Sequence, residues 1–240
     1  ETLRQLSYQV SYVADPITCN ILRACLKALN ADENCVYEFS ATHNNTEQVT
    51  EAQRLIHLLK PKAMLAGELS SRNHHDGVRR NMRGDNVDKW NPPVDELLVQ
   101  YLGQGTIIAV GDGGNEAGMG NLKDRIPLAS DGKTIMASDV YSDIPVTSWN
   151  SNLGLQAIAS VAAAIENRFE WIPTGDQVMH VIEAALNAGA VEGVTRGKEE
   201  NSLNGVYAIR GVDGFIPRIH AADQEKLKST LIQMKLKGLL

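Results

Sequence analysis

The chain of 240 residues has a formal net charge of −6, with 43% hydrophobic and 22% charged residues, which is an ordinary globular composition. This acidic balance and the lack of a basic stripe argue against a nucleic-acid-binding protein. The lack of an apolar run of about 18 residues argues against a transmembrane helix. We therefore expect a single domain over residues 1–240 that contacts neither nucleic acid nor a membrane.

Helix and strand signals alternate along the first half of the chain. Asp15 and Pro16 predict a helix start, and Asn45 with Gln48 resembles a capping box. The polar stretch over 68–91 predicts a working or mobile loop, because connections of this length are uncommon in compact domains. The expected elements, in chain order, are a helix from Pro16, a helix from Asn45 to Leu59, a strand over 63–66, a helix from Pro92 and a strand over 106–110.

The alternation continues after residue 121. Asp176 is the expected cap of a helix, and Val212-Asp213-Gly214 is a hairpin signal. The expected elements are a strand over 134–139, helices over 153–165 and 177–188, a hairpin between 205–209 and 215–217, and a terminal amphipathic helix over 226–234. This order predicts an α/β fold, a layered domain with a mixed or mostly parallel central sheet flanked by helices.

The cysteines Cys19, Cys25 and Cys35 show no C-x-x-C spacing. An odd number of cysteines without a metal-binding spacing is typical of reduced, structural thiols. The sequence therefore predicts an intracellular protein without a disulfide framework.

The most informative run is Gly111 to Asn121, which contains five glycines and directly follows the strand expected over 106–110. It also carries two acids, Asp112 and Glu116. Two carboxylates would repel a pyrophosphate but would hold a hard divalent cation. The dinucleotide fingerprint fails because Glu116 occupies its third glycine position, and the P-loop pattern fails because Pro127 stands where its first glycine belongs. The run therefore predicts a metal and small-anion site at the C-terminal end of a strand.

Several shorter motifs accompany the glycine-rich run. They are Asp76-Gly77, Asn81-Met82-Arg83-Gly84, Ser138-Asp139-Val140, Trp149-Asn150 with Gly154, and Val212-Asp213-Gly214 before His220. Together they resemble the D-glutamate cyclase family, closely from residue 68 onward and more loosely over the first 60 residues. The resemblance implies conversion of D-glutamate to 5-oxo-D-proline with loss of water, assisted by a divalent ion, Mn²⁺ before Mg²⁺ or Ca²⁺.

The same resemblance implies the binding partners and the cellular location of the protein. Its partner would be a small acidic amino acid, and an assembly of identical chains, a homo-oligomer, is compatible with it. Its location would be the cytoplasm in a prokaryote or the mitochondrial matrix in a eukaryote.

The implied reaction assigns chemical roles to the candidate residues. A carboxylate is a poor electrophile, so a cation held by Asp112, Glu116 and Asp139 would stabilise the charge that develops on the attacked γ-carboxylate. The N–H groups of Gly113 and Gly114 would form an oxyanion hole. The remaining candidates are a base among Glu68, Asp76 and His220, a further catalytic residue Asn115, an α-carboxylate clamp from Arg72 or Arg83, and substrate contacts from Asn81 and Asn150.

Two other functions fit the same residues, namely a metal-dependent phosphatase or other hydrolase, and a cation-binding family member without catalysis. Single residues also have structural alternatives. Asp76 and Asp139 could stabilise turns, and Asn81 with Arg83 could hold their loop together through polar contacts. His220 could cap the final helix. Trp149 is expected to pack beneath the site. Arg72 is shifted from the Glu-Arg-x-Gly pattern that is usual in the family.

Overall fold

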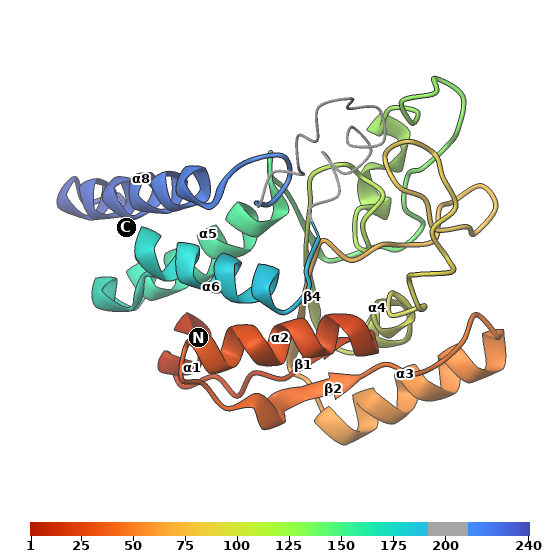
Figure 1. Cartoon of the computed structure of the whole chain (residues 1–240), viewed down its shortest axis with the longest axis horizontal. Coiled ribbons are helices and arrows are strands. Elements are labelled where there is room, and N and C mark those ends of the chain that lie inside the picture. The colour runs from red at the N-terminus through yellow and green to blue at the C-terminus, as the bar shows by residue number, and fades with distance from the viewer. Residues whose placement is uncertain (192–210) are drawn as a thin grey trace. The chain divides into compact units, whose positions relative to one another are not determined.

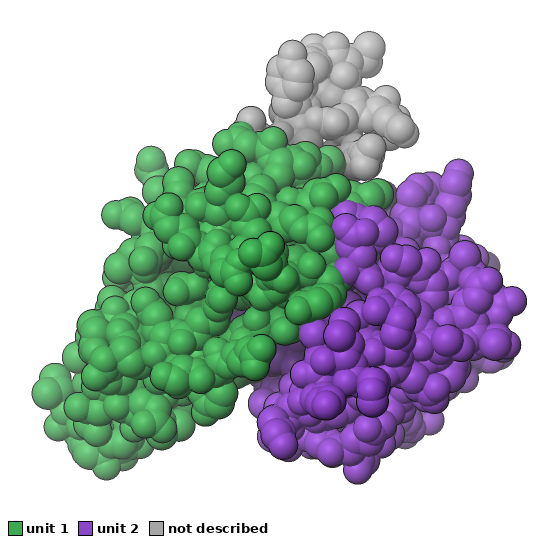
Figure 2. Space-filling model, turned by 90° about the horizontal axis from the view of Figure 1, so that it is seen from below, with its two compact units in different colours: residues 1–12, 17–37, 156–240 green, residues 13–16, 38–155 purple. Residues whose placement is uncertain are grey.

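The computed structural model describes residues 1–191 and 211–240 (Figure 1). Its contacts divide the chain into two compact units, which Figure 2 shows in different colours. Unit 1 comprises residues 1–12, 17–37 and 156–240, and unit 2 comprises residues 13–16 and 38–155. The expected α/β class is confirmed, because helices alternate with a three-stranded parallel sheet and a two-stranded sheet. The single domain expected over the whole chain stays a prediction.

The three-stranded sheet lies in unit 2 and positions the candidate site. It consists of β3 (Ala63–Gly67), β4 (Thr106–Gly111) and β5 (Ile144–Thr147), in the order β3-β4-β5. Both neighbouring pairs are parallel, with Gly67 opposite Val110 in the first pair. The central strand β4 is mostly buried, which its β-branched and small residues favour. The carboxyl ends of the strands therefore meet at one edge of the sheet.

The strand expected over 134–139 is wrong, and β5 takes its place in the sheet. Met136 is buried, as a strand pattern predicts. However, the Ser138 N–H donates to the carbonyl of Gly114 in a loop rather than to a strand. β5 escaped prediction because Pro145 interrupts a short apolar run. A proline is tolerated there because β5 lies at the edge of the sheet β3-β4-β5 formed by the described residues.

Two helices of unit 2, α3 (Asn45–Leu59) and α4 (Glu96–Tyr101), pack against each other. The cap of α3 is Asn44 rather than Asn45, because the Asn44 carboxamide oxygen accepts two N–H groups of the first turn. Helix α4 begins later than the expected Pro92, since Pro92 is itself followed by a proline, which disfavours helical backbone. Unit 2 also contains the 3₁₀ turn η2 (Gly120–Arg125).

The remaining elements are, in chain order, α1 (Thr2–Gln5), β1 (Tyr12–Ala14), α2 (Pro16–Ala28), η1 (Glu33–Cys35), β2 (Val36–Glu38), α5 (Ser151–Ile165), η3 (Phe169–Trp171), α6 (Gly175–Asn187) and α8 (Pro217–Leu236). Strands β1 and β2 form the two-stranded sheet. In unit 1, α6 packs against α8 (Figure 1). A buried cluster of Ala163, Ala164, Ile172 and Leu231 forms a core there.

Helices α6 and α8 start earlier than expected. Thr174, not Asp176, caps α6 through a capping box with Gln177. Helix α8 begins at Pro217, well before the expected start, because proline suits the first turn of a helix. The turn at Val212-Asp213-Gly214 is confirmed by paired backbone bonds across it, whereas the first hairpin segment, 205–209, lies outside the described residues.

Cys19, Cys25 and Cys35 are free thiols, as expected. Within residues 1–191 and 211–240, no helix combines the length and the apolar character needed to cross a bilayer.

Candidate metal centre

Three carboxylates meet at the carboxyl ends of β3 and β4. Glu68 directly follows β3 and Asp112 directly follows β4, so the parallel register brings them to neighbouring strand ends. Glu116 returns to the same place from the glycine-rich loop. One carboxylate oxygen from each of the three lies within 4.8 Å of the other two. We call Glu68, Asp112 and Glu116 the acid group.

The glycine-rich loop folds around the carboxylate of Glu116, which is only 3% exposed. Its Oε1 accepts the N–H of Asp112 at 3.1 Å and that of Gly113 at 2.8 Å, and its Oε2 accepts the N–H of Gly114 at 2.6 Å. Gly114 has a φ of 90°, a conformation that glycine adopts without strain. Burial raises the pKa of Glu116 above its usual value; the N–H bonds oppose this shift and the charge of Asp112 adds to it.

These bonds occupy the N–H groups that were candidates for substrate binding. The oxyanion hole expected at Gly113 and Gly114 is not formed, because both N–H groups donate to Glu116. An oxyanion hole needs donors aimed at the position that the substrate oxygen will take. Asn115, expected among the catalytic residues, donates from Nδ2 to the Arg80 carbonyl at 2.9 Å. It therefore joins the glycine-rich loop to the polar stretch over 68–91.

Asp112 lies at the N-terminus of α5. Its Oδ2 accepts the N–H of Ser151, the first residue of that helix, at 3.1 Å, and the positive end of a helix stabilises a carboxylate there. Asn150 is fully buried, and its Oδ1 accepts the Leu153 N–H at 3.1 Å, which is the bond of a helix cap. Asn150 thus supports the helix end that holds Asp112. Its expected substrate contact stays a prediction.

Glu68 has a backbone conformation that residues with a side chain rarely adopt. Its φ is 53°, and the left-handed region costs such a residue roughly 1–2 kcal/mol. Strain of this kind is concentrated at functional sites, where the surroundings impose it. Here it accompanies the turn at the end of β3 that leaves Glu68 exposed and within reach of the other two carboxylates.

The acid group fits a hard divalent cation. Carboxylate oxygens are preferred ligands of Mg²⁺, Mn²⁺ and Ca²⁺. Oxygens on opposite sides of such a cation lie about 4–5 Å apart, because each metal–oxygen bond is about 2.0–2.6 Å long. The three carboxylate oxygens of the acid group lie within 4.8 Å of one another, which agrees with this spacing. Oε2 of Glu116 accepts one N–H and so keeps a lone pair for a cation.

Asp139, expected as the third ligand, lies outside the acid group. Its side chain is exposed, and its N–H donates to the Arg72 carbonyl at 2.9 Å. Because the strand expected before it does not form, Asp139 does not stand at a strand end of the sheet. Glu68, expected as a base, takes the third position. The signal for this was present in the sequence, since Glu68 follows a correctly predicted strand.

Asp76, another candidate base, belongs to a local turn. Its Oδ1 accepts Nδ2 of Asn73 at 2.7 Å and the Val78 N–H at 3.0 Å, and its Oδ2 accepts Nη2 of Arg80 at 2.5 Å. Burial acts to raise the pKa of Asp76, but these hydrogen bonds outweigh it and hold the pKa below its usual value. A lowered pKa makes a carboxylate a weaker base, so the geometry favours the turn role.

The candidate substrate clamps differ in their surroundings. Arg72 pairs with Glu96, with 2.8 Å between Nη1 and Oε2. Asn81 organises its own loop, because its Oδ1 accepts the N–H groups of Arg83 at 2.9 Å and of Asp85 at 3.0 Å. The Arg83 side chain is exposed. Arg83 is therefore the more exposed of the two arginines.

His220 is buried among local contacts, whereas Trp149 is exposed. His220 belongs to unit 1 and is buried, and its Nε2 donates to the Val212 carbonyl at 3.0 Å. Its ring also meets Phe215 edge to face, with 6.4 Å between the ring centroids. These contacts fasten the Val212 turn to α8 and support a structural role. Trp149 is 54% exposed, so it does not pack beneath the site.

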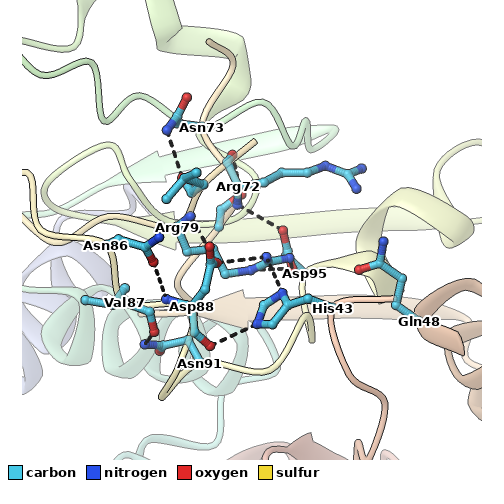
Figure 3. Close-up of polar contacts among 12 residues, drawn as sticks. His43, Gln48, Arg72, Asn73, Arg79, Asn86, Val87, Asp88, Asn91 and Asp95 are labelled. Carbon is cyan, nitrogen blue, oxygen red and sulfur yellow. Dashed lines mark hydrogen bonds and ion pairs between the residues drawn. The ribbon is translucent and has the colours of Figure 1, made fainter. Parts of the chain in front are cut away.

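A buried ion pair that sequence reasoning missed holds the polar stretch over 68–91. The side chains of Arg79 and Asp95 are 4% and 0% exposed. Nε of Arg79 lies 3.1 Å from Oδ1 of Asp95, and Nη2 makes a shorter bond to the same oxygen (Figure 3). Nη1 bonds to Oδ1 of Asp88 at 3.3 Å and to Nδ1 of His43 at 3.1 Å. Each guanidinium nitrogen of Arg79 thus has a partner.

Gly114→Ala should lower the free energy of unfolding by about 1–3 kcal/mol. A φ of 90° strains alanine, and its Cβ would lie 2.3 Å from Cδ1 of Ile126. Gly113→Ala is the matched control, because its φ is not positive and the nearest atoms to its Cβ belong to side chains, Sδ of Met82 at 2.5 Å and Oδ1 of Asn115 at 2.8 Å. Urea unfolding of both variants measures the difference. Equal losses would contradict the structural role assigned to Gly114.

Comparison with known families agrees with the motifs. A family model described as D-glutamate cyclase-like, C-terminal, matches residues 1–206. The chain belongs to this family. The match includes the first 60 residues, where the motifs resemble the family only loosely, and all of the acid group, whereas His220 lies beyond it. No curated protein matches the chain.

Proposed function

We propose that the chain is a lyase of the D-glutamate cyclase type, which closes D-glutamate to 5-oxo-D-proline with loss of water at a cation bound by the acid group. The observation that carries the proposal is the meeting of Glu68, Asp112 and Glu116 at neighbouring strand ends in a member of this family. Carboxyl ends of parallel strands are the usual position of ligand sites in α/β proteins. We propose that the bound cation is Mn²⁺, with Mg²⁺ and Ca²⁺ as alternatives.

The reaction is balanced within one substrate molecule. The amine nitrogen bonds to the γ-carboxyl carbon, one carbon–oxygen bond of that carboxylate breaks, and two protons of the ammonium group leave with the oxygen as water. A bound divalent cation supplies a Lewis acid for the attacked carboxylate. Ring closure gains from proximity, because nucleophile and electrophile share one molecule.

The proton transfers are assigned to the carboxylate oxygen of Glu68 that does not bind the cation. Its carboxylate is exposed at the strand end, so it can approach the substrate ammonium group and pass a proton to the departing oxygen. Asp112 and Glu116 instead hold the site together, the first through α5 and the second through the loop N–H groups. Their bonds keep the acid group in place while the substrate binds and leaves.

The α-carboxylate of the substrate is assigned to Arg83. Arg83 follows Met82, whose Sδ lies 2.5 Å from where a Cβ on Gly113 would stand. The loop over 81–85 therefore lies against the glycine-rich loop. A guanidinium can hold a carboxylate by two parallel hydrogen bonds, which would fix the orientation of the amine toward the γ-carboxyl carbon.

A second candidate function is cation binding without catalysis. It is favoured by the pairing of three arginines of the polar stretch with carboxylates, Arg72 with Glu96, Arg79 with Asp95 and Arg80 with Asp76. These ion pairs occupy guanidinium groups that could otherwise bind the carboxylates of an acidic substrate. A metal-dependent phosphatase remains the third candidate, because acid-lined cation sites also serve phosphoryl transfer.

Chelator-treated protein given Mn²⁺ and D-glutamate should form 5-oxo-D-proline, and L-glutamate should react more slowly. Glu68→Gln should lower the rate by about 100-fold or more, which is a usual contribution of a general acid–base residue. Glu183→Gln, an exposed glutamate on α6, is the matched control and should keep the wild-type rate. Chiral chromatography of the product measures both.

Parallel assays separate the candidates. Phosphate release from a generic aryl phosphate, with no 5-oxoproline, would favour the phosphatase. Cation-dependent thermal stabilisation without either product would favour the binding protein. Absence of 5-oxoproline from both enantiomers with Mn²⁺, Mg²⁺ and Ca²⁺ would overturn the cyclase assignment.

A further inference from the structure

Two buried serine hydroxyls beside the acid group have no hydrogen-bond partner among residues 1–191 and 211–240. They are Oγ of Ser70 and Oγ of Ser151. The whole of Ser151 is buried, with 0% exposure. Buried hydroxyls are almost always hydrogen-bonded in folded proteins, because an unpaired one loses the bonds that it would make in water. Each of the two therefore calls for an explanation.

Ser151 is tied to Asp112 through its backbone. Its N–H donates to Oδ2 of Asp112 at 3.1 Å, and it is the first residue of α5. The Cα–Cβ bonds of an α-helix tilt toward its N-terminus. The Ser151 hydroxyl is therefore directed toward the same end of the helix as the Asp112 carboxylate.

Ser70 stands directly opposite Glu116. The two form an antiparallel bridge, flanked by bonds from the Ser71 N–H to the Asn115 carbonyl and from the Ala117 N–H to the Leu69 carbonyl. This pattern makes Ser70 and Glu116 a non-hydrogen-bonded pair, in which side chains on the same face lie close together. Their Cβ atoms are expected about 4.5–5.5 Å apart. The Ser70 hydroxyl is thus a neighbour of the Glu116 carboxylate.

We propose that the hydroxyls of Ser70 and Ser151 are the neutral donors of the cation site, and that they bind the cation, or water on it, when the acid group is loaded. This inference rests on the cation-binding part of the proposed function. Three carboxylates already exceed the charge of a divalent cation, whereas Mg²⁺ and Mn²⁺ favour octahedral sets of about six oxygen ligands. Neutral oxygens complete such a set without further negative charge. Loading would also give both buried hydroxyls the partner that they lack.

Ser160 provides a matched control on the same helix. Its hydroxyl is also buried without a partner in the described part of the chain. It lies nine residues beyond Ser151 on α5, which is about 13 Å along a helix axis. Ser160→Ala removes the same kind of atom without touching the end of the helix that holds Asp112.

The test measures Mn²⁺ binding by titration calorimetry and by thermal shift, on chelator-treated wild-type protein and on three variants. Ser70→Ala and Ser151→Ala should each weaken Mn²⁺ binding by about 10-fold or more, the range found for residues that support metal ligands. Ser160→Ala should leave the Kd within about twofold of wild type, a margin well below that range. Ser70→Thr keeps a hydroxyl and should retain most of the affinity.

The outcomes separate this inference from the proposed function. If wild type binds Mn²⁺ and both alanine variants match it, the hydroxyls are not donors, while the acid group stands as the cation site. If wild type does not bind a cation, both proposals are overturned. Urea midpoints without metal confirm that each variant folds. Where an alanine variant does not fold, the Ser→Cys variant at that position replaces it. Sulfur is a poor ligand for these hard cations, so the cysteine variant should weaken Mn²⁺ binding as well.

Discussion

Asp95→Asn should lower the free energy of unfolding by about 3–5 kcal/mol, the usual cost of removing one partner of a buried ion pair. Asp95 is fully buried, and its Oδ1 accepts two bonds from the Arg79 guanidinium (Figure 3). Its Oδ2 accepts the Arg72 N–H at 3.0 Å. The substitution keeps the size of the side chain but removes the charge, so the Arg79 cation stays buried without its main counter-ion. Urea unfolding measures the loss.

Two further variants show whether burial is the cause. Asp88→Asn alters a partner of Arg79 whose side chain is 26% exposed, and it should cost about 1 kcal/mol or less, because water reaches this carboxylate and screens its charge. The double variant Arg79→Met with Asp95→Asn removes both charges and should lose less than the sum of the two single losses. Stability of Asp95→Asn within about 0.5 kcal/mol of wild type, the size of an ordinary surface substitution, would contradict this account.

The sheet was predictable where local signals agreed. Strands β3 and β4 consist of short apolar runs bounded by a proline or by glycines, and both were located from the sequence. β5 contains Pro145, which argues against a strand unless the strand is known to lie at an edge. The run over 134–139 is buried at its centre, as a strand of the sheet would be, but its backbone bonds to loops. Strand position in a sheet is a tertiary property that local periodicity does not contain.

The candidate site was likewise predictable only where local sequence signals were sufficient. Asp112 and Glu116 belong to one short loop after a correctly predicted strand, so their proximity could be read from the sequence. Glu68 and Asp139 both stood at predicted strand ends, and the choice between them depended on which strand neighbours β4. The parallel pairing of β3 with β4 settles that the acid group contains Glu68.

Interactions between distant polar residues were beyond sequence reasoning. Arg79 and Asp95 are separated by fifteen residues without periodic structure, and nothing local marks either one as buried. The bond between Ser151 and Asp112 likewise joins two elements that are far apart in the chain. Such pairs become visible only when the fold has brought their backbones together.

Asp112→Asn should abolish most of the stabilisation by Mn²⁺. A ligand at a hundred times its Kd stabilises the folded state by about 2.7 kcal/mol, which corresponds to a rise in Tm of about 5–10 °C for a chain of this size. Without metal, the variant should be nearly as stable as wild type, because the asparagine carboxamide oxygen can still accept the Ser151 N–H that bonds to Oδ2 of Asp112. Thermal unfolding of chelator-treated protein, with and without Mn²⁺, measures both quantities.

Asp139→Asn makes the same chemical change at an exposed aspartate outside the acid group, and it should keep the full rise in Tm. The comparison therefore decides between two ligand sets, one with Glu68 and one with Asp139. Loss of the rise in Asp139→Asn, with the rise kept in Glu68→Gln, would restore Asp139 as a ligand and show that the loop after residue 134 moves when metal binds. An unchanged Tm in wild-type protein would remove the cation from the site altogether, because three carboxylates that hold a divalent ion only in the folded state must stabilise that state.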